Sequence, residues 1–307
     1  MRVQSLGLHT DLALHGWRGS VRDRIDHLVV TDVENPDFRW GNVLVFDAPP
    51  AADDFERWCD LFDASIGTPP WVPHRAFGWD GLDGDEGELA PFLAAGFERE
   101  RGLVLAASRL AAPESANRDV RIRPLHGDAD WAAARDGQRI AIEATGEEPA
   151  HERFITRLMA AYRRVVDAGH GVWWGAFDGD ALVANLGVFK VGELARYQAV
   201  VTDPEYRRRG VASTLVHHAA EAARTVWGSE LLLLETEPEG PALGLYERLG
   251  FAPIEQRVGV CQYPRPEVDP WRAPEADEAD AAHGAHTEGP AEAPADATAR
   301  SGDVTAR

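Results

Sequence analysis

Basic side chains and a glycine follow an apolar run in the segment Tyr197–Ala212, which reads YQAVVTDPEYRRRGVA. The apolar residues predict a buried strand, and a helical pattern begins at Gly210. A helix start leaves backbone N–H groups without partners and carries partial positive charge, and a glycine lets an anion approach the backbone. The segment therefore predicts a cradle for a phosphate-rich ligand. Its spacing is neither Gly-x-Gly-x-x-Gly nor Gly-Lys-Ser/Thr, so dinucleotide and nucleoside triphosphate loops are not indicated.

A second candidate group is the phenol of Tyr246, in the segment PALGLYERLGF at 241–251. Pro241 suits the first position of a helix, and Gly250 suits the position just after a helix end, so a short helix is predicted to carry the tyrosine. A phenol is protonated near neutral pH and can give a proton to a leaving group. Four leucines at 231–234 predict a buried strand between the two segments.

Together the two segments resemble the signatures of the GCN5-related N-acetyltransferase (GNAT) superfamily. The first matches through Arg207-x-x-Gly210-x-Ala212, and the second through Leu-Tyr-x-x-x-Gly-Phe, in the family's order and near its spacing. The resemblance covers residues 120–262 and implies a mixed α/β fold, a sheet flanked by helices. In that fold the two middle strands diverge, and the pantetheine arm of acetyl-coenzyme A pairs with the exposed strand edge.

The same resemblance implies roles for particular residues. Tyr246 would protonate the departing thiolate. The coenzyme would be bound by a strand end and the loop after it, at Val200, Val201, Thr202, Arg207, Arg208, Arg209, Gly210, Val211, Ala212 and Ser213. The family often has asparagine seven residues before the tyrosine, whereas this chain has Glu239, which leaves the local loop geometry open.

The group that removes a proton from the substrate is less well defined. Attack on a thioester needs a neutral amine, so an ammonium substrate must first lose a proton. Glu235, at the end of the leucine strand, is the first candidate for this base, and Glu143 is the second. For each, a solvated surface carboxylate is the alternative interpretation, and a water relay would need no dedicated carboxylate.

Hydrophobic periodicity places these residues on a series of elements in the order β-α-α-β-β-β-α-β-α-β. The Asp-Gly-Asp sequence at 178–180 predicts a hairpin turn. The adjacent Trp173 and Trp174 should face opposite sides of their strand. Strands are predicted at 120–124, 171–177, 181–189, 195–202, 231–235 and 255–262, and helices at 129–143, 153–168, 210–227 and 242–249.

The chain divides into zones of different composition. Residues 1–110 form an N-terminal unit, residues 111–119 (AAPESANRD) a linker, and residues 120–264 the unit with both motifs. Residues 273–307 are rich in Ala, Glu, Asp and Pro, and are predicted to be a disordered acidic tail because they have little apolar surface to bury.

The N-terminal unit contains a segment similar to the tyrosine motif. Leu89–Phe97 resembles Leu243–Phe251, with Phe92 four residues before its glycine, as Tyr246 is. The first unit is therefore interpreted as a degenerate GNAT-like copy that packs against the catalytic half and walls its cleft. It has no Arg-x-x-Gly-x-Ala loop, and Phe92 has no hydroxyl. The alternative is a chance match between two apolar helices.

Composition limits the classes of partner. The formal net charge of −20 argues against general binding to nucleic acid or to anionic membranes. Neither an apolar leader nor a membrane-length apolar run is present, and the two cysteines form no metal or redox pair by spacing, so a cytoplasmic protein without metal is predicted. The neighbouring His217 and His218 have no partners at metal spacing, and His283 and His286 lie in the acidic tail.

These observations predict an N-acetyltransferase that moves an acetyl group from acetyl-CoA to a primary amine. The acceptor would be a small molecule or a peptide, attacking directly in a ternary complex, and the enzyme would be a monomer or homodimer. One alternative is a tandem GNAT enzyme of the mycothiol synthase type. The other is a non-catalytic acyl-CoA-binding regulatory module.

Overall fold

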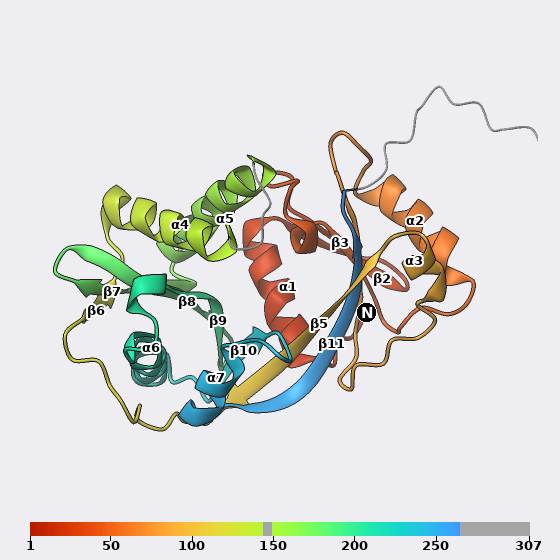
Figure 1. Ribbon diagram of the computed structural model, residues 1–307. Coiled ribbons are helices and arrows are strands. Elements are labelled where there is room, and N and C mark those ends of the chain that lie inside the picture. Colours follow the sequence, from red (N-terminus) through yellow and green to blue (C-terminus); the bar gives the residue numbers. More distant parts are fainter. Residues whose placement is uncertain (144–148, 265–307) are drawn as a thin grey trace, which may run out of the picture. The chain divides into compact units, whose positions relative to one another are not determined.

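The structure of the protein is a computed structural model that describes residues 1–143 and 149–264 (Figure 1). The strands in this part of the chain are β1 (Ser20–Asp23), β2 (His27–Thr31), β3 (Val43–Phe46), β4 (Arg75–Trp79), β5 (Glu98–Ala107), β6 (Arg121–Pro124), β7 (Gly171–Asp178), β8 (Ala181–Val191), β9 (Leu194–Thr202), β10 (Leu231–Thr236) and β11 (Ala252–Gln262). The α-helices are α1 (Leu6–Arg18), α2 (Asp54–Ser65), α3 (Ala90–Ala94), α4 (Gly127–Glu143), α5 (Pro149–Asp167), α6 (Val211–Trp227) and α7 (Leu243–Leu249). The α/β class and the predicted element order of the second half are confirmed.

The described strands form one mixed sheet in the order β1-β2-β3-β4-β11-β5-β10-β9-β8-β7-β6. Each half repeats one pattern. Strands β1, β2 and β3 are antiparallel neighbours and β3 is parallel to β4, just as β7, β8 and β9 are antiparallel and β9 is parallel to β10. The repeated connectivity confirms two tandem GNAT-like units.

The two halves exchange their last strands. Strand β5, from the first half, lies between β10 and β11, and β11 lies between β4 and β5; all these pairs are antiparallel. The long gold and blue ribbons of β5 and β11 are side by side in Figure 1. Strands from both sides of the expected linker at 111–119 therefore belong to one sheet. The domain boundaries proposed from the sequence stay a prediction.

The sequence repeat corresponds to a repeated structure. Gly96 after α3 has φ +84°, and Gly250 after α7 has φ +101°, the left-handed conformation that closes a helix. The N–H of Phe97 donates to the carbonyl of Phe92 at 3.0 Å, and the N–H of Phe251 donates to the carbonyl of Tyr246 at 3.1 Å. Each short helix therefore ends in the same way before entering an exchanged strand.

Helices cover both faces of the second half. Trp173 packs with α4 and α5, while Trp174 packs on the opposite face and its ring lies 4.9 Å from that of His218 on α6. The predicted opposite orientation of the two tryptophans is confirmed, and both serve in packing. Figure 1 shows α4 and α5 on one side of these strands and α6 on the other. The predictions for 273–307, and so for His283 and His286, lie outside the described residues.

Candidate active site

Strands β9 and β10 pair only at their beginnings. Their register joins Leu231 to Leu194, Leu232 to Ala195 and Leu233 to Arg196, although β9 continues to Thr202 and β10 to Thr236. The register of β9 against β8 shifts close by, and Ala199 has φ +52°. This bulge bends the strand, so the edge of β9 from Tyr197 onward is not paired with β10. The predicted divergence of the middle strands is present.

The loop after β9 forms a concave set of backbone amides. Arg208 has φ +60° and Gly210 has φ +74°, and α6 begins at Val211. Left-handed residues spaced in this way turn successive N–H groups toward one point, an arrangement that binds anions. Among the described residues, none accepts a hydrogen bond from the amides of Arg208 to Ser213. The amides are therefore available for an anion, at the positive end of a 17-residue helix.

The loop rests on the segment between β5 and β6. The Asn117 side chain donates to the Arg209 carbonyl at 2.9 Å, and the Asn117 N–H donates to the Thr214 hydroxyl at 2.8 Å. A Cβ on Gly210 would lie 2.0 Å from the Ser115 carbonyl oxygen. Two structural reasons therefore require glycine here: the positive φ and the close contact with Ser115. The sequence suggests a third reason, the close approach of an anion.

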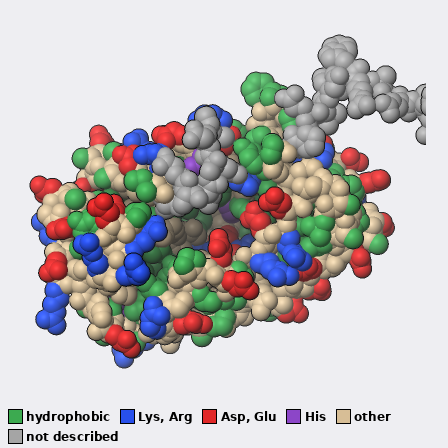
Figure 2. Space-filling view, in the orientation of Figure 1, with side chains coloured by type: hydrophobic (Ala, Val, Ile, Leu, Met, Phe, Trp, Pro, Cys, Tyr) green, Lys and Arg blue, Asp and Glu red, His purple; other side chains and the backbone are tan. Residues whose placement is uncertain are grey.

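A cavity of about 760 Å³ lies at the divergence and is lined by residues of both halves. Gln198 and Val200 on β9 and Glu235 on β10 line it, as does Tyr246 on α7, and α1 of the first half forms another wall. Figure 2 shows the molecule hollowed near the middle of the visible face, with charged side chains of both signs around the hollow. The cavity therefore brings both predicted catalytic residues, Tyr246 and Glu235, to one space.

Tyr246 is placed to stay protonated. Its side chain is only 6% exposed, and burial raises the pKa of its phenol to about 12. Its ring packs edge-on against Phe251, with centroids 6.0 Å apart. The hydroxyl is therefore a neutral proton donor over the whole physiological range.

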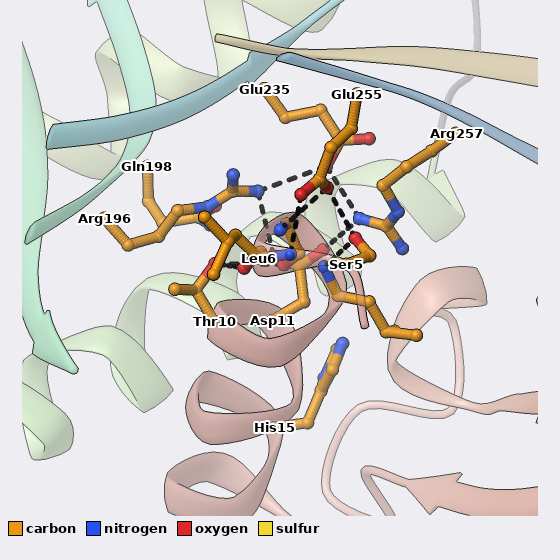
Figure 3. A network of polar contacts seen from close by, with 12 residues as sticks. Ser5, Leu6, Thr10, Asp11, His15, Arg196, Gln198, Glu235, Glu255 and Arg257 are labelled. Carbon is orange, nitrogen blue, oxygen red and sulfur yellow. Dashed lines mark hydrogen bonds and ion pairs between the residues drawn. The ribbon is translucent and has the colours of Figure 1, made fainter. Parts of the chain in front are cut away.

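Glu235 belongs to a network of four charged side chains, shown in Figure 3. Its Oε2 accepts from Arg196 Nη2 at 3.2 Å and from Arg257 Nη1 at 2.7 Å. Asp11 of α1 accepts from the same two guanidinium groups, 2.9 Å from Arg196 Nη2. A Cβ on Gly102 would lie 2.0 Å from Glu235 Oε1, so that oxygen packs against β5. The network thus joins α1, β9, β10 and β11 at the floor of the cavity.

The network favours the charged form of Asp11. Burial acts to raise the pKa of Asp11, but the guanidinium groups of Arg196 and Arg257 outweigh it and lower that pKa to about 2. Burial also acts to lower the pKa of Arg257, but Glu235 and Asp11 raise it above its usual value. The four groups therefore neutralise one another within the protein.

Comparison with known protein families assigns part of the second half to a family. Residues 130–251 match the model of the acetyltransferase (GNAT) family. This part of the chain is a GNAT domain. No curated protein matches the chain in sequence.

Solved structures share the fold over most of the chain. A conserved protein of unknown function from Staphylococcus epidermidis is 11% identical with a TM-score of 0.65, covering 80% of this chain and 94% of its own. A GCN5-related N-acetyltransferase from Kribbella flavida is 16% identical with a TM-score of 0.54, covering 83% and 95%. A GCN5-related N-acetyltransferase from Sphaerobacter thermophilus is 16% identical with a TM-score of 0.52, covering 84% and 87%.

The other predicted coenzyme residues of the GNAT domain belong to the end of β9 and the loop that follows it. Val201 is buried, the guanidinium of Arg207 donates to the Thr202 carbonyl at 3.2 Å, and that of Arg209 lies 5.1 Å from the centre of the Tyr206 ring. The side chain of Glu143, the second candidate base, lies outside the described residues. The roles of all these residues stay predictions.

The first half has no counterpart of the cradle. Its equivalent loop, between β3 and α2, runs from Asp47 to Asp53 and contains two adjacent prolines, which have no N–H to offer. Acidic residues occupy the first turn of α2, where they oppose an anion. Phe92, the counterpart of Tyr246, is fully buried in an aromatic core.

Several cavity residues were missed from the sequence, namely Asp11, His15, Arg18, Arg196 and Arg257. Arg196 gave one usable signal, because it is the one charged residue in the strand LARYQAVVT. Among the described residues, no group of three or more His, Cys, Asp or Glu side chains is placed to hold a metal ion. Nor does any helix there have the length and apolar character to cross a bilayer.

Proposed function

We propose that the chain is an N-acetyltransferase that moves an acetyl group from acetyl-CoA to a primary amine by direct attack in a ternary complex. The observation that carries the proposal is the unpaired edge of β9. The free amides of Arg208–Ser213 follow one end of it, and Tyr246 lines the cavity beside it. A long, thin thioester with a pyrophosphate at one end fits this order of features.

Each group of residues would have a separate role in binding or catalysis. The amides of Arg208–Ser213 would bind the pyrophosphate, and the arginines of the loop would add positive charge at its rim. The β9 edge would pair with the amides of the pantetheine arm, as an added strand does. The amine nitrogen forms a bond to the thioester carbonyl carbon, the carbon–sulfur bond breaks, and Tyr246 gives its proton to the sulfur. The nitrogen gives up a proton in return, which balances the transfer.

We propose Glu235 as the carboxylate that helps remove this proton. One of its oxygens accepts from Arg196 and Arg257, and the other packs against Gly102. Both guanidinium groups donate to Oε2, which lowers the basicity of that oxygen toward an amine. We therefore assign Glu235 a water-mediated role rather than direct abstraction.

The cradle is tested by coenzyme A titration in a calorimeter. Ser213→Glu places a carboxylate in the first turn of α6, where it opposes a pyrophosphate, and should weaken coenzyme binding at least about tenfold through charge repulsion at the helix end. Val226→Glu adds the same charge at a position 75% exposed near the other end of α6, and is the matched control. Gly210 is a poor test site because its substitution also strikes Ser115.

Turnover is tested separately by thiol release from acetyl-CoA with a panel of primary amines. Tight coenzyme binding without thiol release on any amine would favour the non-catalytic acyl-CoA-binding module. Equal coenzyme affinity in wild type and Ser213→Glu would overturn the cradle itself.

A further inference from the structure

Helix α1 of the degenerate half is fixed across the cavity of the other half. The Glu255 carboxylate of β11 accepts from the N–H of Leu6 at 2.7 Å, the N–H of Gly7 at 3.1 Å and the hydroxyl of Ser5 at 2.6 Å. One turn later, Asp11 meets Arg196 and Arg257. Figure 3 shows both sets of contacts, with His15 further along the same helix. The face of α1 that follows Asp11 is thus held in a defined position.

That face presents one leucine and three polar side chains to the cavity. Leu8, Asp11, His15 and Arg18 are spaced by three, four and three residues, which places them on one side of a helix, and all four line the cavity. Asp11 is already neutralised by the network. His15 and Arg18 therefore define what this wall of the cavity offers to a ligand.

Arg18 is a cation without an anionic partner in the part of the chain that the structure describes. Among the described residues, no carboxylate lies within ion-pair distance of it; Asp32 is near enough for Arg18 to affect its pKa but forms no ion pair. The guanidinium carbon lies 5.1 Å from the ring centre of Phe38 and 4.9 Å from that of Tyr162, and Nε and Nη1 have no hydrogen-bond partner. An enclosed guanidinium with unused donors is unfavourable unless an anion completes it.

His15 supplies a neutral donor beside this cation. Arg18 Nη2 donates to His15 Nδ1 at 3.2 Å, so the ring hydrogen is on Nε2. Burial first, and Arg18 second, lower the pKa of His15 to about 3, so the ring is uncharged at neutral pH. One guanidinium and one neutral N–H match a ligand group whose single negative charge is shared by two oxygens, such as a carboxylate. A doubly charged phosphate suits the site less well, because Glu100 and Glu237 also line the cavity.

The wall beyond α1 is apolar. Val30, Val43 and Val45 from β2 and β3, together with Trp40, line the part of the cavity that belongs to the first half. A ligand held by its carboxylate at Arg18 would have apolar surface available for a side chain.

On the basis of the proposed function, we infer that the acceptor is an amino acid with an apolar side chain, whose carboxylate binds Arg18 and His15. The degenerate half would then recognise the acceptor, while the other half binds acetyl-CoA. The carboxylate would orient the amine toward the gap between β9 and β10.

The test compares matched acceptors that differ by the carboxylate, using thiol release from acetyl-CoA. Phenylalanine against phenethylamine, and leucine against isopentylamine, are suitable pairs. Wild type should prefer the amino acid by about 10- to 100-fold in kcat/KM, the size expected for a charge-assisted hydrogen-bonded pair. Arg18→Met should abolish this preference while turnover of the amine partner is retained. Arg101→Met removes a cavity-lining arginine that pairs with Glu86, and should keep the preference.

The outcomes separate this inference from the proposed function. No thiol release with any amine would count against the acetyltransferase, whereas turnover without preference for the carboxylate would overturn only the amino acid assignment. A preference that survives in folded Arg18→Met would also overturn it. If Arg18→Met does not fold, calorimetric binding of phenylalanine and phenethylamine to wild type with coenzyme A gives the answer: equal affinity overturns the inference, and tighter binding of phenylalanine supports it.

Discussion

Replacing Tyr246 by phenylalanine removes the phenol proton that the proposed mechanism gives to the leaving sulfur, and keeps the ring. The ring is 6% exposed and packs against Phe251, so phenylalanine fills the same space. Among the described residues, none forms a hydrogen bond with the hydroxyl. The free energy of unfolding should therefore change by less than about 1 kcal/mol. General acid catalysis contributes about 10²–10⁴-fold, and a fall in kcat near the lower end is expected because water can reach an open cavity.

The assay measures thiol release at saturating acetyl-CoA and amine, with coenzyme affinity measured separately. Affinity should be unchanged, because the free amides of Arg208–Ser213 are untouched. The defect should shrink with a thioester whose thiol is more acidic, because such a leaving group needs less protonation. Tyr263→Phe removes a phenol that lies outside the cavity and is the control.

The pH profile gives an independent check. Because burial raises the pKa of Tyr246 to about 12, its protonated form persists to high pH, and wild-type kcat should not fall near pH 10 through this group. Wild-type turnover in Tyr246→Phe, or a defect that is the same for all leaving groups, would refute the role of Tyr246 as the acid.

Four further outcomes are expected. The pKa of Asp11 is lowered from 3.8 to about 2, so its stabilisation is complete above about pH 5 and is lost as pH falls toward 2; in urea unfolding, the free energy of unfolding of Asp11→Asn should fall by about 2 kcal/mol less than that of wild type between about pH 5 and about pH 2. Glu235→Gln should lower kcat more than coenzyme affinity; equal kcat would remove it from proton transfer. Asn117→Ala should weaken coenzyme binding severalfold by loosening the loop, as titration would show. Coenzyme should bind once per chain, and a stoichiometry of two would reveal a site near Asp47–Asp53.

The second half was predictable because its signals are local. The leucine run, the hairpin turn and the glycine after α7 are each read from a few adjacent residues, and each element appears within a few residues of its expected place. The start of β5 has no comparable sequence signal, because Glu98–Arg101 alternates charges and contains no apolar residue. Arg99 and Arg101 pair there with Glu86, so solvent-facing ion pairs stand where an apolar pattern would have marked the strand.

The contacts that complete the candidate site are not local. Asp11 meets Arg257, which is 246 residues away in the chain, and Arg196, which is 185 residues away. Periodicity assigns a residue to a helix or strand but does not identify the partner strand at either edge. The exchange of β5 and β11 was therefore outside what the sequence could predict, and with it the position of α1 over the cavity.

The exchange gives a physical reason for a half without a cradle to persist in this chain. Without β5, strands β10 and β11 would each lose a neighbour and expose a row of unpaired backbone groups. Gly102 on β5 also leaves the space that Glu235 occupies, so the exchanged strand shapes the floor of the cavity. Changes in the loop from Asp47 to Asp53 affect neither contribution. The first half can therefore lack its own anion site while its strand and its first helix remain necessary to the other half.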